Sequence, residues 1–320
     1  MSDMPMPGIS RHELKELIMT CSGASAVGIA RACPVEDHAR ELYRNWIADG
    51  CNAEMDYLER YDDVRSDPDL LLEGTQCVIM TAFSFANPRT VEEMERSKKP
   101  LIAEYALGRD YHKELRRRLK MAANKLTQTW GGNARICIDT APLRERYWAA
   151  KAGLGFIGTN NYLIIPGMGA SYFLGAVLWT GATIDGYDIP LERSCGECGV
   201  CVSSCPTGAL QADGRLDARR CLSYQTIENH EAIPEDIDPG KRLFGCDTCR
   251  KVCPHNAVAK TQTNIEAFKA RPEVVKLTAG DWRSMDQSRF DALFGDSAVR
   301  RAGLEKLKST LRRAEKNGNF

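Results

Sequence analysis

The sequence predicts an α+β protein in which a domain of mixed helices and strands precedes a small domain rich in cysteine. Two observations predict this arrangement. Residues 1–185 alternate between segments with the 3.6-residue period of helices and short apolar segments typical of buried strands. Residues 191–256 instead contain closely spaced Cys, Gly and Pro with little apolar periodicity. We therefore expect domains at 1–185 and 186–260, followed by a basic helical segment at 261–320.

Helical patterns recur through the first domain. Two helices are expected within residues 10–50, and Ser10 is a candidate cap for the first of them. Residues 110–130 form the clearest amphipathic pattern, which ends at Gly131-Gly132 because glycine favours helix termination. A shorter helix is expected at residues 143–153.

Strand patterns lie between these helices. Residues 77–86 form a continuous apolar run, and residues 134–142 alternate in polarity before stopping at a proline. Residues 161–166 and 171–181 predict a further pair of strands joined by a glycine-rich turn.

Charge and composition limit the class of protein. The 43 basic and 43 acidic residues balance, which argues against a strongly basic nucleic-acid binder but allows a local basic face. No apolar run approaches the roughly 20 residues of a membrane span, and the N-terminus lacks a secretory pattern. We therefore expect a cytoplasmic protein without a membrane partner, whose 13 cysteines serve as reduced thiols rather than as disulfides.

Eight cysteines of the second domain fall in two runs. The first is Cys195-Gly-Glu-Cys198-Gly-Val-Cys201-Val-Ser-Ser-Cys205-Pro206. This is the C-x2-C-x2-C-x3-C-P spacing of bacterial ferredoxins, in which three thiolates bind one 4Fe–4S cluster and the fourth binds the other cluster.

The second run holds the last three members of the same pattern. It reads Cys246-Asp-Thr-Cys249-Arg-Lys-Val-Cys253-Pro254, and Cys221 is the replacement for the missing first member. The sequence thus predicts a ferredoxin-like domain with two 4Fe–4S clusters. We expect one cluster to take Cys195, Cys198, Cys201 and Cys253, and the other Cys205, Cys221, Cys246 and Cys249.

Zinc is the alternative occupant of these cysteines, since paired C-x2-C segments also suit tetrahedral zinc. Eight thiolates with x3 gaps and two Cys-Pro endings favour two iron–sulfur clusters. Such clusters transfer single electrons, so the long preceding domain is expected to hold a second redox site.

Two further motifs are less specific. The segment from Gly153 to Gly158 matches G-x-G-x-x-G, but a helix precedes it and a strand follows, the reverse of a dinucleotide site. A glycine-lined wall beside a flat cofactor is the better interpretation. Asp110-Tyr-His112 is interpreted as a helix cap with a surface histidine, and Leu115 occupies the glycine position of a cobalt-ligating histidine motif. Ligation of cobalt by histidine is therefore not expected.

Asp139 follows an apolar strand and precedes Thr-Ala-Pro. It can be a simple turn residue at the strand end. Alternatively, desolvation beside a cleft can raise the pKa of its carboxyl group, so that it donates a proton at neutral pH.

Several stretches together resemble the epoxyqueuosine reductase family. They are residues 105–120, 137–164 and 221–230, the eight-cysteine segment, and the basic segment 297–319. The resemblance implies a nitroreductase-like α/β cobalamin-binding domain joined to the ferredoxin-like domain. It implies an oxidoreductase that reduces the epoxide of epoxyqueuosine at the tRNA wobble position to queuosine. The implied cofactors are two 4Fe–4S clusters and base-off cobalamin without a histidine ligand, and the implied partners are that tRNA and an external electron donor.

The resemblance also implies roles for individual residues. Asp139 matches the family's proposed proton donor, and Gly155, Gly158 and Asn160 lie in its cofactor-side segment. Ser223 lies where the family places a residue against cobalamin. Many members continue into a helical-repeat extension, so we expect the tRNA contacts of that extension to be absent or replaced here.

Two other functions remain open from the sequence. A corrinoid reductive dehalogenase would share the cobalt and the clusters but act on a small halogenated molecule. A cobalamin-free electron-transfer protein would use the clusters alone.

Overall fold

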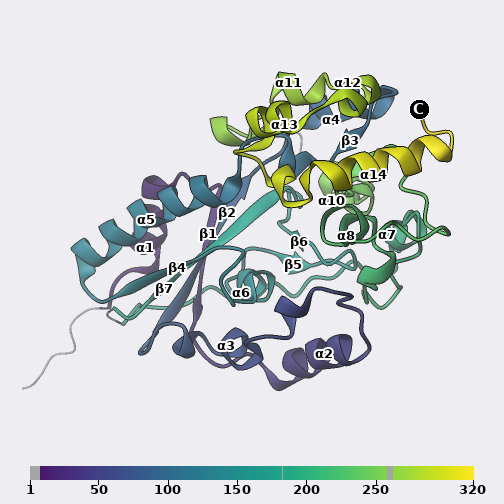
Figure 1. The fold of residues 1–320 in the computed structure, drawn as a ribbon. Coiled ribbons are helices and arrows are strands. Elements are labelled where there is room, and N and C mark those ends of the chain that lie inside the picture. Colours follow the sequence, from purple (N-terminus) through teal and green to yellow (C-terminus); the bar gives the residue numbers. More distant parts are fainter. Residues whose placement is uncertain (1–7, 182, 258–261) are drawn as a thin grey trace, which may run out of the picture.

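The computed structural model describes residues 8–181, 183–257 and 262–320 (Figure 1). Its largest sheet contains antiparallel strands in the order β1-β2-β7-β4. These strands are β1 (Ala26–Arg31), β2 (Cys77–Ser84), β7 (Tyr172–Trp179) and β4 (Ala134–Cys137). Among the described residues, no helix combines the length and apolar character needed to span a bilayer.

Helices pack on both faces of this sheet (Figure 1). On one face α1 (Arg11–Ser22) and α5 (Tyr111–Trp130) bury Leu14 and Leu119 against Ile79. On the other face α6 (Glu145–Lys151) buries Trp148 against Val78, and α2 (Asp37–Ala48) and α3 (Asp62–Ser66) add to the same core. Because both faces are covered, β2 has no alternation of apolar and polar residues.

The structure confirms the expected helices of the first domain. Helices α1 and α2 lie within residues 10–50, α5 within 110–130 and α6 within 143–153. Ser10 occupies the N-cap position of α1, but its side chain makes no capping hydrogen bond. Asp110 caps α5 by accepting a hydrogen bond from the backbone N–H of His112 at 2.9 Å.

The expected pairing of the strands at 161–166 and 171–181 is wrong. Strand β7 lies between β2 and β4, where it pairs with every residue of β2. Strand β6 (Leu163–Ile164) pairs instead with β5 (Phe156–Ile157) in a short hairpin. Strand β1 has no counterpart in the sequence prediction, and its Gly28 is required because an added Cβ would lie 2.1 Å from the carbonyl oxygen of Ala152.

A second core joins three parts of the chain. Strand β3 (Leu101–Ile102) pairs in parallel with β8 (Arg242–Phe244), and helices from the C-terminal segment cover this pair (Figure 1). The helices of this region are α4 (Pro88–Arg96), α11 (Pro272–Val275), α12 (Ala279–Ser284), α13 (Gln287–Phe294) and α14 (Gly303–Lys316). This core crosses the proposed domain boundaries near residues 185 and 260.

The cysteine-rich segment consists of loops and short helices. These are α7 (Val200–Ser203), α8 (Leu222–Ile227), α9 (Thr248–Lys251) and α10 (Pro254–Ala257). Short 3-10 turns occur at Asp56–Leu58, Pro68–Leu70, Glu104–Ala106, Ala218–Arg220, Glu266–Phe268 and Ala298–Arg301. Part of the segment packs in an apolar core, because Ile227, Leu243 and Phe244 are buried in the second core.

Candidate active site and cluster-binding segment

Asp139 lies two residues after β4 in an unusual backbone conformation. Its φ is +45°, which is in the left-handed region. Its backbone N–H donates a 2.7 Å hydrogen bond to Oε1 of Glu145, the first residue of α6. Its side chain is 50% exposed. The start of α6 thus fixes the turn, while the Asp139 carboxylate remains accessible.

His112 lies between two carboxylates. Its Nε2 is 2.9 Å from Oδ2 of Asp139, and its Nδ1 is 2.8 Å from Oδ1 of Asp110. Tyr111 stacks on Phe173 of β7 with ring centroids 4.2 Å apart, which anchors the first turn of α5 against the sheet. Both ring nitrogens of His112 are therefore occupied by protein groups.

The two carboxylates determine the protonation of His112. The hydrogen bond to Asp110, followed by the one to Asp139, raises the pKa of His112 to about 9. His112 is therefore a cation at neutral pH.

The prediction that desolvation raises the pKa of the Asp139 carboxyl group is wrong. Partial burial does raise the pKa of this carboxyl group, but the hydrogen bond and charge of His112 outweigh burial and lower it, assisted by Tyr111 and Arg301. Burial raises the pKa of Glu145 to about 8. At neutral pH, protons therefore reside on His112 and Glu145, and Asp139 is ionised.

Sequence reasoning missed His112 and Glu145 as members of this site. The Asp110-Tyr-His112 motif correctly indicated a helix cap, but the pairing with Asp139 joins residues 27 positions apart in the chain. The only signal for Glu145 was its place at the start of an expected helix near Asp139.

The eight cysteines belong to the two groups of four expected from the sequence, and thiols within each group affect one another's pKa values. Burial raises the pKa of Cys253, and the nearby thiols of Cys195 and Cys198 raise it further. Cys201 is affected in the same way by Cys195 and Cys253. These four cysteines come from both runs of the sequence.

The second group contains the remaining four cysteines. Burial raises the pKa of Cys221, and the thiols of Cys246 and Cys205 add to this rise. Burial also raises the pKa of Cys249, with contributions from Cys246, Cys221 and Cys205 and a further one from Cys201 of the first group. Cys221, which lies outside both local runs, is thus near the other three thiols.

The β5–β6 hairpin contacts both groups of cysteines. The backbone N–H of Thr159 lies 3.4 Å from Sγ of Cys195, and a Cβ added to Gly158 would also lie 3.4 Å from that sulfur. Asn160 is buried and donates through Nδ2 to the carbonyl oxygen of Cys249 at 2.9 Å.

Gly155 and Ser223 have different surroundings. A Cβ on Gly155 would lie 2.2 Å from the carbonyl oxygen of Ile164, so the close approach of the two strands of the hairpin requires glycine. Ser223 lies in the first turn of α8, two residues after Cys221, and is partly buried.

Comparison with known proteins defines first the class and then the family. A model described as a 4Fe-4S double cluster binding domain matches residues 194–256, which contain all eight cysteines. The chain is therefore an iron–sulfur protein, and the zinc alternative is set aside. A second model, described as epoxyqueuosine reductase QueG, DUF1730, matches residues 65–140.

A relative that matches over most of both chains extends these results. An epoxyqueuosine reductase from Cyclobacterium marinum is 36% identical over 288 residues, covering 88% of this chain and 90% of the relative. This chain belongs to the epoxyqueuosine reductase family, whose members are oxidoreductases. Family membership favours an epoxyqueuosine reductase over a reductive dehalogenase and over a cobalamin-free electron-transfer protein, the two alternatives that the sequence left open.

Solved structures share the fold. A selenomethionine-labelled epoxyqueuosine reductase matches with a TM-score of 0.84 at 25% identity, covering 95% of this chain and 80% of that chain. An epoxyqueuosine reductase crystallised with a tRNA-Tyr epoxyqueuosine-modified stem loop matches with a TM-score of 0.82 at 24% identity, with the same coverage. The expected combination of a mixed α/β domain with a double-cluster segment is confirmed.

Proposed function

We propose that this protein reduces the epoxide of epoxyqueuosine in tRNA to the alkene of queuosine. The observation that carries the proposal is an accessible Asp139 carboxylate, hydrogen-bonded to a cationic His112, in a chain of this family that also contains the double-cluster segment. Converting an epoxide to an alkene and water consumes two electrons and two protons. An external reductant must therefore supply electrons, and the site must supply protons.

Electrons are proposed to enter through the two 4Fe–4S clusters. One cluster takes Cys195, Cys198, Cys201 and Cys253, and the other takes Cys205, Cys221, Cys246 and Cys249. The effects of neighbouring thiols on the pKa values of Cys201, Cys253 and Cys221 support this division. The effect of Cys201 on Cys249 indicates that the two groups also lie near each other.

Cobalamin is the proposed second redox group. When bound, it supplies a cobalt centre that can deliver electrons to the epoxide. The residues present fit binding without a ligand from His112, because carboxylates engage both of its ring nitrogens. Gly158, Asn160 and Ser223 are proposed to line the cofactor, since the first two lie against the cysteine groups and Ser223 follows Cys221 closely. Gly155 is proposed to belong to the same side of the cofactor site. Its lack of a side chain allows the two strands of the hairpin to approach each other closely.

Asp139 is proposed to deliver protons to the departing epoxide oxygen. The proton on Nε2 of His112 can pass along the 2.9 Å hydrogen bond to Oδ2 of Asp139 and then to the substrate. Glu145 is neutral at pH 7 and contacts the backbone of Asp139, so it is the proposed store of the second proton.

The substrate is proposed to be tRNA carrying epoxyqueuosine. The similar structure with a modified stem loop supports this partner. An unstacked base must reach Asp139, and Arg301 of the C-terminal segment is near enough for its charge to lower the pKa of that residue. Two of the basic side chains of α14 are engaged internally, because Lys306 and Arg313 donate to carbonyl oxygens at residues 231–235. Arg301 is itself paired with Glu228 at 2.6 Å, but it is proposed to contact RNA because its charge acts on Asp139.

The test is anaerobic turnover by protein loaded with both clusters and cobalamin. A chemical reductant and tRNA containing epoxyqueuosine are added. The tRNA is then digested, and its nucleosides are separated and identified by mass spectrometry. The amount of queuosine is expected to increase with reaction time and with the amount of enzyme. Fully loaded protein that leaves epoxyqueuosine unchanged contradicts the proposal.

A further inference from the structure

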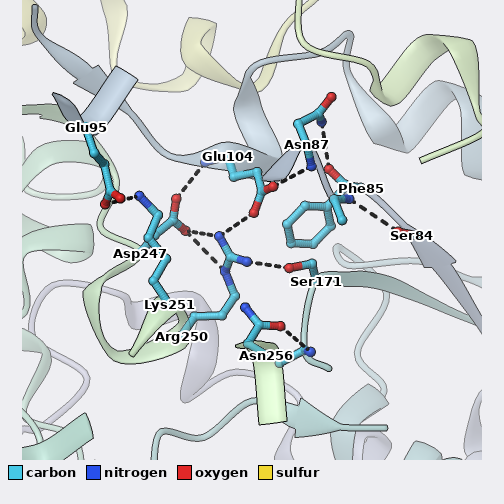
Figure 2. A network of polar contacts seen from close by, with 12 residues as sticks. Ser84, Phe85, Asn87, Glu95, Glu104, Ser171, Asp247, Arg250, Lys251 and Asn256 are labelled. Atoms are coloured by element: carbon cyan, nitrogen blue, oxygen red, sulfur yellow. Dashed lines mark hydrogen bonds and ion pairs between the residues drawn. The ribbon is translucent and has the colours of Figure 1, made fainter. Parts of the chain in front are cut away.

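Arg250 is a buried cation within the cluster-binding segment. It lies on α9 immediately after Cys249, and its side chain is only 2% exposed. Figure 2 shows it facing Glu104 and Asp247, whose carboxylates lie 2.7 and 3.0 Å from Nη2. Nη1 donates to Oγ of Ser171. One cation thus faces two carboxylates in a dry environment.

Both carboxylates are held in place by further hydrogen bonds. Oδ2 of Asp247 accepts the backbone N–H of Glu104 at 2.7 Å, and Oε1 of Glu104 accepts the backbone N–H of Asn87 at 2.5 Å (Figure 2). The side chains of Glu104 and Asp247 are 5% and 9% exposed. One basic and two acidic side chains give these three residues a formal charge of −1, and the neighbouring Lys251 is balanced by its own pair with Glu95.

The network connects two functional parts of the molecule. Asp247 and Arg250 belong to the run that contains Cys246 and Cys249. Glu104 begins a short turn, and Asp110, which contacts His112, follows six residues later in the sequence. The ion pairs therefore attach a cluster-binding loop to the segment that leads to the proposed proton site.

Stability alone is a poor explanation for this arrangement. Removing three charged groups from water is costly, and apolar side chains of similar size often stabilise a core as well or better. A net negative charge in a low-dielectric region does, however, act on a nearby redox centre, because an added electron is repelled by it. The reduction potentials of iron–sulfur clusters depend on such charges.

We propose that Arg250, Glu104 and Asp247 fix the loop of Cys246 and Cys249 and, through their net negative charge, lower the reduction potential of the cluster bound there. The inference rests on the proposed ligation of that cluster. Arg250 is a positioning residue, because its contacts are with the protein and not with the substrate.

The test is a redox titration of cluster-loaded protein, without cobalamin or RNA, followed by electron paramagnetic resonance. Glu104→Gln keeps the shape of the side chain and removes one negative charge. One of the two clusters is expected to shift to a more positive potential, while the other keeps the wild-type value. Asp247→Asn is expected to shift the same cluster in the same direction, and it provides the second test if Glu104→Gln does not fold.

Glu95→Gln is the matched control. Glu95 pairs with Lys251, also on α9, at 2.7 Å, but its side chain is 48% exposed and water screens its charge. Its variant is expected to keep the wild-type potentials. Wild-type potentials in folded, fully loaded Glu104→Gln or Asp247→Asn overturn the inference. Iron and sulfide analysis for two clusters per chain separates this result from failure of the proposed ligation.

Discussion

At the scale of single residues, Asp139 shows how neighbours decide the chemistry of a side chain. Its left-handed backbone costs a non-glycine residue about 1–2 kcal/mol, and the hydrogen bond from its N–H to Glu145 helps to hold this conformation. Its carboxylate is ionised because His112 is cationic. The proposed acid–base function of the site thus involves three residues, Asp139, His112 and Glu145.

Replacing Asp139 with Asn is expected to reduce turnover by about 10²–10⁴-fold, the usual contribution of a positioned proton-transfer group. Cluster content and cobalamin binding should remain at wild-type levels, because the amide preserves the shape of the side chain. Single-turnover formation of queuosine measures the effect. Asp37→Asn is the control, since the Asp37 side chain is 96% exposed. Unchanged turnover in the Asp139 variant contradicts the proposed role.

Replacing His112 with Gln is expected to remove a pH-dependent part of the stability. The pKa of His112 rises from 6.5 to about 9 on folding, so its stabilising effect is fully present below pH 6.5 and is lost as the pH rises through about 9. The difference in free energy of unfolding between wild type and His112→Gln should therefore be larger near pH 6 than above pH 9. Anaerobic denaturant titrations at both pH values measure it.

The control for this prediction is His38→Gln, because His38 is exposed on α2. Its effect on stability should be small at both pH values. If the His112 and His38 variants show the same dependence on pH, the pairing of His112 with the two carboxylates does not govern its protonation.

At the scale of elements, the β5–β6 hairpin explains the glycine motif that began as a possible nucleotide site. Helix α6 precedes the motif and strand β6 follows it, as the sequence indicated, while β5 lies within the motif. The glycines permit close backbone packing and contact with cysteine, as seen at Gly155 and Gly158. The hairpin is thus a connection between the main sheet domain and the cluster segment.

Replacing Gly155 with Ala is expected to destabilise the protein by about 1–3 kcal/mol, the usual cost of overpacking. The added Cβ would lie 2.2 Å from a backbone oxygen, which cannot move without shifting β6. Thermal unfolding and iron content measure the effect. Gly186→Ala is the matched control, because its Cβ would meet no atom within 4 Å. If the two variants are equally stable, close packing of the hairpin does not require glycine at position 155.

At the scale of the whole molecule, the cluster segment has two modes of attachment. Residues 195–205 are exposed or half-buried, so we expect their order to depend on the proposed metal clusters. Residues 227–244 contribute buried side chains to a core that they share with α13 and α14. The two parts should therefore respond differently to loss of iron.

Removing iron with a chelator is expected to increase amide hydrogen exchange strongly at residues 195–205. Exchange at β8 and in the main sheet should change much less, because these strands keep their apolar packing. Mass spectrometry of peptic peptides measures both regions in one experiment. A uniform increase across the chain would show that the clusters hold the entire fold together.

The sequence alone determined the features that depend on local spacing. The ferredoxin pattern identified the eight cysteines, and the amphipathic period identified α5, because ligand spacing and helical periodicity are properties of short segments. The pattern around Asp139 also marked it as a candidate acid. The wider resemblance supplied the family, which the comparisons confirmed.

Only the tertiary structure decided which distant segments meet. It placed β7 between β2 and β4, paired His112 with Asp139, and buried Arg250 against Glu104. The protonation of Asp139 was predicted wrongly for the same reason, since a pKa depends on charges that the fold brings near. Such contacts join residues far apart in the chain, and neither hydrophobic period nor motif spacing encodes them.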